Sequence, residues 1–224
     1  MKKVVKFGGS SLANAEQFQK VGDIIRSDES RRYVVPSAPG KRFDEDIKVT
    51  DMLYGCYDAA SKGEDFSDKL KAIKERYYEI IKGLGLTLSL EDEFKKIEED
   101  FRAQAGIQYA ASRGEFLNGK IMAAYLGYEF IDADLLIQKA EGKLLREIIE
   151  EKGTDGFIEV ENRVNSQIRT THSVIATGGS VVYGKEAMER LANSRVAFFG
   201  IGGVGGYVCE ALIRSGVGAF DLID

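Results

Sequence analysis

Apolar residues along the chain alternate between short runs of β type and longer segments with helical spacing. Runs rich in Val, Ile, Phe and Tyr predict six strands, at residues 4–7, 33–35, 128–134, 172–177, 195–199 and 219–223. Between them, apolar positions such as Phe18, Val21 and Ile25 recur on one helix face. Strands separated by helices are typical of parallel sheets. The pattern predicts an α/β fold: a three-layer, mostly parallel sheet of about six strands with helices on both faces.

One long helical stretch interrupts this alternation after the second strand. Residues 49–125 have an almost wholly helical pattern, which predicts a helical insertion. Within it, Phe94, Ile97 and Phe101 predict a core stripe beneath a solvated face. Residues 112–119 hold more polar and glycine residues than a structural helix needs, so this cluster is a candidate site. Further helices are expected at residues 135–152, 155–169, 185–192 and 206–215.

Composition narrows the possible partners. The net charge of -5, with both signs interspersed, predicts no basic face for nucleic acid and no membrane partner. Cys56 and Cys209 form no CxxC pair, which favours a reducing cytoplasm over a disulfide framework or a zinc site. His172 is the only histidine, and we expect it at a strand edge rather than as a catalytic base. No apolar run approaches about 18 residues, and the chain is expected to be cytoplasmic.

The first strand ends in a glycine turn that could bind phosphate. Lys6 precedes Gly8, Gly9 and Ser10, and a helical segment follows from about residue 13. Uncovered backbone N–H groups, a helix N-terminus and a lysine ammonium together suit a phosphate group. An ordinary strand-to-helix turn explains the same residues equally well.

A second glycine turn has a sharper pattern. Gly200, Gly202 and Gly205 match G-x-G-x-x-G between a predicted strand and a predicted helix. Asp221 and Asp224, at the end of the next strand, are placed to reach a ribose hydroxyl. This context favours nucleotide binding over a tight packing turn.

Residues 1–133 resemble the N-terminal part of aspartokinase, an amino-acid kinase. The resemblance is carried by KFGGSS at residues 6–11, VPSA at 35–38, VTD at 49–51 and SRGEF at 112–116. It implies phosphoryl transfer from ATP, with Mg, to the β-carboxylate of aspartate.

The same resemblance implies roles for individual residues. Lys6 would neutralise charge on the transferring phosphoryl group, and Gly8, Gly9 and Ser10 would cradle it. Ser37, Thr50 and Glu115 would hold aspartate.

Two later stretches resemble other families. Residues 126–191 resemble the middle of shikimate kinase, which implies that Asp134 and the turn at 178–179 contact a sugar-like substrate. That family's G-x-x-x-x-G-K-[ST] turn is absent, and Ile158 stands where an arginine is expected. Residues 186–224 resemble the start of the ubiquitin-activating-type adenylyltransferases, in which Gly200, Gly202 and Gly205 would carry ATP phosphates and Asp224 the ribose.

The three resemblances overlap where they meet, which predicts a mosaic chain, designed or recombined. Its segments are an amino-acid-kinase-like part at 1–133, a shikimate-kinase-like part at 134–192 and a Rossmann-type part at 193–224, or all three form one continuous unit. The leading hypothesis is an incomplete aspartokinase-like, ATP-dependent phosphotransferase. The alternative is a mosaic without catalysis that binds nucleotide or phosphate at a glycine-rich turn. The order of the strands does not follow from the pattern.

Overall fold

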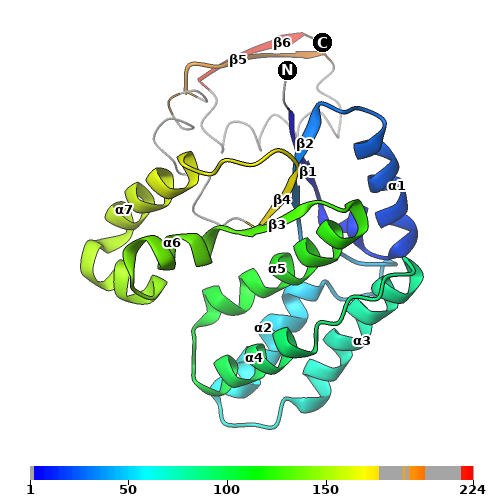
Figure 1. Ribbon diagram of the computed structural model, residues 1–224, viewed down its shortest axis with the longest axis vertical. Coiled ribbons are helices and arrows are strands. Elements are labelled where there is room, and N and C mark those ends of the chain that lie inside the picture. The colour runs from blue at the N-terminus through cyan, green and yellow to red at the C-terminus, as the bar shows by residue number, and fades with distance from the viewer. Residues whose placement is uncertain (1–2, 177–188, 190–191, 200–217, 224) are drawn as a thin grey trace. The chain divides into compact units, whose positions relative to one another are not determined.

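The strands and helices of the chain divide into two units. The computed structural model describes residues 3–176, 189, 192–199 and 218–223 (Figure 1). One unit comprises Met1–Leu136 with Ile168–Gly178, and the other Ile137–Gln167 with Gly179–Asp224. The described residues contain seven α-helices and six strands. None of these helices combines the length and the apolar character that crossing a membrane demands.

A four-stranded parallel sheet organises the first unit. Its strands are β1 (Lys3–Phe7), β2 (Arg31–Pro36), β3 (Glu129–Asp132) and β4 (Ser173–Ala176), in the order β1-β2-β4-β3. In the register, Phe7 pairs with Pro36 and Asp132 with Ala176. The carboxyl ends of all four strands therefore meet at one edge of the sheet, where parallel sheets bind ligands.

Helices α1 (Ala15–Arg26) and α5 (Ile107–Leu126) pack on one face of this sheet. The connections from β1 to β2 and from β2 to β3 run in the same direction across the sheet, so right-handed crossovers place both helices on the same side. Their C-terminal turns meet directly, because the Arg26 guanidinium donates to the Tyr125 carbonyl at 2.9 Å. A Cβ on Gly22 would lie 2.5 Å from the Tyr125 ring, so only glycine permits this crossing.

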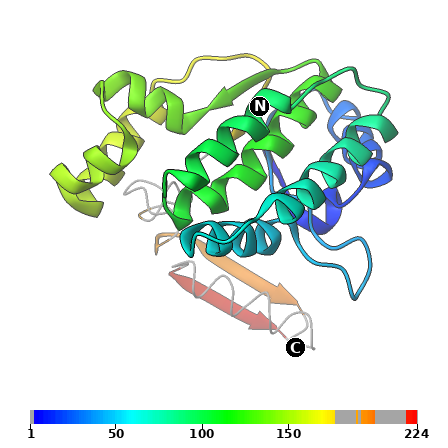
Figure 2. The same cartoon turned by 90° about the horizontal axis from the view of Figure 1, so that it is seen from below.

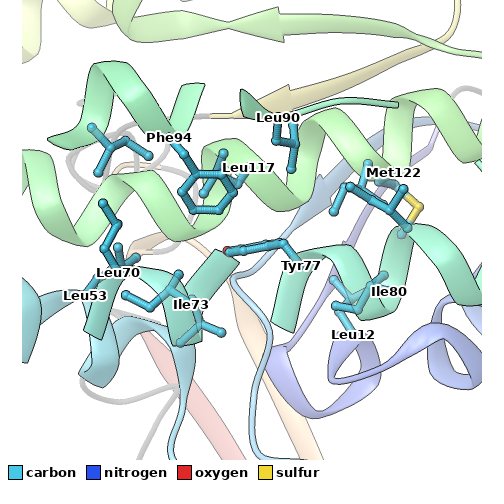
Figure 3. Packing of buried hydrophobic residues seen from close by; sticks show 14 of the residues in the cluster. Leu12, Leu53, Leu70, Ile73, Tyr77, Ile80, Leu90, Phe94, Leu117 and Met122 are labelled. Carbon is cyan, nitrogen blue, oxygen red and sulfur yellow. The ribbon is translucent and has the colours of Figure 1, made fainter. Parts of the chain in front are cut away.

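The predicted helical insertion consists of α2 (Val49–Ser61), α3 (Ser67–Gly83), α4 (Glu91–Arg102) and α5. Figures 1 and 2 show these helices, cyan to green, gathered side by side. Their apolar stripes make one core in which Tyr77 is central, with its hydroxyl donating to the Gly114 carbonyl at 2.7 Å (Figure 3). The predicted stripe on α4 is confirmed, because Phe94, Ile97 and Phe101 are buried.

The second unit contains most of α6 (Ala133–Glu141), α7 (Leu145–Ser166), β5 (Arg195–Phe199) and β6 (Ala219–Ile223). Helix α6 ends near Gly142 instead of continuing to residue 152, because Gly142 adopts a positive φ of 67°. Helix α7 is kinked at Gly153, where φ is 69°. Strands β5 and β6 pair in parallel as a separate two-stranded sheet.

This sheet pairing corrects the expected architecture. The single sheet of six strands is not found in the described residues, because the strands divide into a sheet of four and a sheet of two. The three-layer arrangement is not confirmed either. The helices expected at 185–192 and 206–215 lie almost wholly outside the described residues. His172 directly precedes β4, as expected for a strand-edge residue, and its ring lies 5.2 Å from that of Tyr128.

Candidate functional site

The loops that follow β1 and β2 are joined at the carboxyl edge of the four-stranded sheet. The backbone N–H of Ser37 donates to the Phe7 carbonyl at 3.0 Å, and that of Gly40 donates to the Gly9 carbonyl at 2.8 Å. Both bonds arise because β1 and β2 are in register up to their last residues. The predicted phosphate turn and the loop that carries Ser37 therefore form one structure.

Gly8 and Gly9 have different reasons for being glycine. A Cβ on Gly9 would lie 2.8 Å from the Ala38 carbonyl oxygen, and a Cβ on Gly40 would lie 2.5 Å from the Gly9 carbonyl carbon. Gly9 is thus required for close packing of the two loops. A Cβ on Gly8 would meet nothing within 4 Å, and Gly8 has an ordinary φ of -73°. Gly8 is exposed and leaves its backbone open to a ligand.

The sequence pattern suggested that the glycine turn leads directly into the first helix. In the structure, the turn and α1 are separate. Residues Gly9–Leu12 form a separate short 3-10 helix, η1, and Ser10 lies within it. Helix α1 begins at Ala15, where the Asn14 side chain accepts a hydrogen bond from the Gln17 N–H at 3.0 Å. The turn is therefore separated from the first residue of α1 by η1, and the groups nearest to a phosphate there would be backbone N–H groups and Lys6.

Lys6 and Glu115 act on one another across this edge. Burial raises the pKa of the Glu115 carboxyl, and the positive charge of Lys6 lowers it in part. No ion pair of 4.0 Å or less joins them in the described parts of the chain, and the Lys6 side chain is exposed. The structure thus brings together an open cation and a half-buried carboxylate from distant parts of the sequence.

Ser37 and Thr50 are tied to the same edge through the backbone. The Asn118 side chain, which is fully buried on α5, donates to the Ser37 carbonyl at 2.6 Å. The Val49 N–H donates to the Pro39 carbonyl at 3.1 Å and anchors the first turn of α2, which carries Thr50. Both predicted substrate residues are half-buried. The role of Asn118 was not predicted, although it falls within the cluster at residues 112–119.

The glycines of that cluster have a structural explanation. A Cβ on Gly114 would lie 2.7 Å from the Cβ of Ala38, and a Cβ on Gly119 would lie 2.7 Å from the Phe130 ring. They allow α5 to approach the sheet and the loop after β2 closely. The cluster is therefore partly a packing surface, and Glu115 is the member whose pKa the charge of Lys6 lowers.

Asp134 lies in the first turn of α6, directly after β3, and its surroundings are side chains of the protein itself. Burial, followed by the charge of Asp132, raises the pKa of Asp134 to about 6, and Arg113 opposes this rise. The Arg113 guanidinium lies 4.0 Å from the Asp134 carboxylate and stacks between the rings of Tyr109 and Phe116, at 4.5 and 4.6 Å. Arg113 was not predicted to contact Asp134, because α5 and the first turn of α6 meet only in the folded chain.

The remaining predicted site residues, Gly200, Gly202, Gly205 and Asp224, lie outside the described residues. The strands on either side are described: β5 ends directly before Gly200, and β6 pairs with it in parallel. Asp221, the other acid considered for a ribose, forms an ion pair with Arg195 at 2.5 Å. No cluster of three or more His, Cys, Asp and Glu side chains suited to a metal ion occurs in the described parts of the chain.

Comparison with known proteins gives different families along the chain. The shikimate kinase family profile matches residues 117–199, and the ThiF family profile matches residues 179–224. Aspartokinase 3 of Bacillus subtilis is 38% identical over 146 residues, covering 62% of this chain and 32% of the relative. Shikimate kinase of Synechococcus sp. (strain RCC307) is 43% identical over 70 residues, covering 31% of this chain and 36% of the relative. The chain spans about a third of the length of these curated relatives.

Solved aspartokinases have the same fold. The Clostridium acetobutylicum aspartate kinase superposes with a TM-score of 0.61 at 38% identity, covering 77% of this chain and 37% of that chain. The E. coli aspartokinase III complex with aspartate and ADP superposes with a TM-score of 0.54 at 19% identity, covering 88% of this chain and 48% of that chain. The similarities to aspartokinase and shikimate kinase are thus confirmed, whereas the ThiF match is confined to a short stretch.

Proposed function

We propose that the carboxyl edge of the four-stranded sheet is the substrate site of an aspartokinase-like, ATP-dependent phosphotransferase. The observation that carries this proposal is that Lys6 lies near enough to Glu115 at this edge for its charge to lower the pKa of the Glu115 carboxyl. Both residues belong to motifs of the aspartokinase resemblance, and the 38% identity to Bacillus subtilis aspartokinase 3 supports the same function.

The geometry suits transfer of a phosphoryl group to a carboxylate. A β-carboxylate oxygen of aspartate would attack the γ-phosphorus of ATP while the bond to the ADP oxygen breaks, giving β-aspartyl phosphate and ADP. Lys6 would stabilise the charge on the transferring group, and the Gly8 backbone would approach it. The Glu115 carboxylate would accept hydrogen bonds from the substrate ammonium, with Ser37 and Thr50 beside it.

The residues present fit the phosphate part of ATP. The Lys6 ammonium makes no hydrogen bond with another residue of the described ranges, and the space beside Gly8 is open for phosphate oxygens. Mg accompanies ATP in most kinases because it neutralises the phosphate oxygens. We assign no residue to Mg, since the described ranges contain no suitable group of ligands.

The test is formation of β-aspartyl phosphate, trapped with hydroxylamine as the hydroxamate, from aspartate, ATP and Mg. We expect a signal from the unaltered chain that is lost in Lys6→Ala. Lys3→Ala is the matched control, because Lys3 lies on the same strand but pairs with Asp28 at 2.7 Å. An aspartate-dependent signal no higher in the unaltered chain than in Lys6→Ala would refute the proposal.

A second candidate function is nucleotide or phosphate binding without turnover at Gly200, Gly202 and Gly205. The parallel pairing of β5 with β6 favours it, because a G-x-G-x-x-G turn needs a strand before it and a parallel strand after it. Calorimetry with ATP and Mg should then show binding that Gly202→Val abolishes. Equal binding by the two proteins would exclude this turn.

We further propose that the chain is a mosaic of the three segments 1–133, 134–192 and 193–224. The overlapping matches to shikimate kinase and ThiF profiles, next to the aspartokinase similarity, support it. Limited proteolysis should cut first near residue 134 or 192 if the segments are independent. A single calorimetric transition and cuts elsewhere would indicate one continuous unit instead.

A further inference from the structure

The loop between β2 and α2 is held in place by polar contacts. In the part from residue 41 to residue 48, the apolar residues Phe43 and Ile47 are 58% and 56% exposed, and Asp46 is the one residue that is not exposed, with 9% of its side chain open to solvent. A cavity of about 360 Å³ lies between the loop and α3. Between residues 41 and 48, no apolar side chain is buried, so the position of this part of the loop has to come from other contacts.

One buried guanidinium supplies those contacts. Arg76 on α3 is only 3% exposed, and its Nη1 donates to the Ile47 carbonyl at 2.5 Å. Its Nη2 donates to the Gly40 carbonyl and lies 3.0 Å from the Asp46 carboxylate. Arginine suits this task because its planar group donates several hydrogen bonds in fixed directions. Arg76 thus holds Gly40, Asp46 and Ile47 of this loop together.

The loop between β2 and α2 contacts the candidate site at both the glycine turn and the first turn of α2. Gly40, which Arg76 holds by the carbonyl, donates its own N–H to Gly9 at 2.8 Å and packs against it without room for a Cβ. At the other end, Ile47 lies two residues before the start of α2, whose first turn carries Thr50. A shift of the loop would move both the glycine turn and Thr50, because close-packed backbone transmits displacement.

We infer that Arg76 is a positioning residue for the phosphate turn and for Thr50, acting through Gly40 and Ile47. This inference rests on the proposed function of the sheet edge. Arg42 offers a matched comparison on the same loop. It pairs with Asp46 at 2.9 Å and with Glu79 at 3.1 Å, but it is exposed and donates to neither carbonyl that Arg76 holds.

The kinetic test compares Arg76→Met, Arg76→Lys and Arg42→Met in the hydroxamate assay. Arg76→Met should lower kcat/KM about 10- to 100-fold, as small displacements in an active site do. Arg76→Lys should recover part of the loss, and Arg42→Met should keep the original value. Equal losses in Arg76→Met and Arg42→Met, or unchanged kinetics in Arg76→Met, would overturn the inference.

Amide hydrogen exchange tests the same link without relying on activity. Exchange of the Gly40 N–H should accelerate in Arg76→Met relative to the amides of α1, which report general stability, and should not change in Arg42→Met. If the unaltered chain shows no turnover, the proposed function fails and exchange at Gly40 still decides the inference. Unchanged exchange in Arg76→Met contradicts it, and Arg76→Lys takes its place if Arg76→Met does not fold.

Discussion

Each end of the carboxyl edge of the four-stranded sheet has a basic residue near an acidic one, but the two basic residues differ in exposure and in pairing. At the end formed by β1 and β2, Lys6 is exposed, and its charge lowers the pKa of Glu115 without a close ion pair in the described residues. After β3, the Arg113 guanidinium is enclosed by two aromatic rings and lies 4.0 Å from Asp134. The comparison shows that the protein pairs the charged groups after β3 with its own side chains and leaves the Lys6 ammonium without a close partner in the described residues.

Glu115→Gln and Arg113→Met should separate the two ends most strongly. Loss of a charge-assisted hydrogen bond to the substrate ammonium should raise the KM for aspartate about 10- to 100-fold in Glu115→Gln. Arg113→Met should leave the KM unchanged, because its partners are the protein's own side chains. The measurement is the dependence of the hydroxamate signal on aspartate concentration. A comparable rise in Arg113→Met would erase the contrast.

Asp134→Asn should make the protein more stable at pH 7. The pKa of Asp134 is raised from 3.8 to about 6, so its charged form is disfavoured in the folded state. The cost of the Asp134 carboxylate to the free energy of unfolding is absent below pH 3.8, the pKa of the group in the unfolded chain. This cost grows as the pH rises towards 6 and reaches about 3 kcal/mol at pH 7. Urea unfolding of both proteins should show a gap at pH 7 that closes near pH 4. A gap that does not vary with pH would point to lost packing instead.

At the sheet end formed by β1 and β2, Gly9→Ala should lower the stability of the protein, whereas Gly8→Ala should weaken phosphate binding. The added methyl group at Gly9 meets the Ala38 carbonyl oxygen at 2.8 Å, so the free energy of unfolding should fall by about 1–3 kcal/mol. The same change at Gly8 meets nothing within 4 Å and should leave stability unchanged while weakening phosphate binding. Thermal unfolding and calorimetry with ATP measure the two effects. Equal stability of the variants would contradict the packing role of Gly9.

The smallest expected effect concerns the Glu115 carboxyl in Lys6→Ala. Lys6 lowers the pKa of Glu115 against the larger opposing effect of burial, so removing the ammonium should raise this pKa further. NMR titration of the Glu115 side chain measures the change, and Lys3→Ala should show none. A pKa of Glu115 that stays the same in Lys6→Ala would mean that the two groups do not share a site.

Local pattern was enough to predict the first unit's strands and its helical insertion. Val34 and Val174, for example, lie in short β-branched runs and are buried in the sheet. Pattern was not enough for the strand order, because β4 inserts between β2 and β3 through contacts that no local signal records. The division into two sheets was missed for the same reason, since the alternation of helix and strand is identical in one sheet or two.

The candidate site was predictable where it depends on motifs and not where it depends on packing. Lys6, Ser37 and Glu115 were found from motifs, and the structure brings all three to one edge. Arg76 was missed because a polar residue in a helix normally indicates a solvated face, and Asn118 lay in the candidate cluster at residues 112–119 without a predicted role. Both are buried, and their partners are backbone carbonyls, which leave no trace in the side-chain pattern.

The position of β4 has a consequence for how this chain folds during synthesis. In the described sheet, β4 lies between β2 and β3 and pairs with both. Strand β3 pairs only with β4, and β2 pairs with β4 at positions such as Tyr33 and Ser173. The sheet thus cannot close until nearly the whole of the first 176 residues has left the ribosome. Pairings this distant in sequence slow folding and prolong the exposure of unpaired strand edges. The contacts within the helical core of α2 to α5 are nearer in sequence, so this core can form before β4 has been synthesised. Strands β2 and β3 are then already connected by this core when β4 pairs between them.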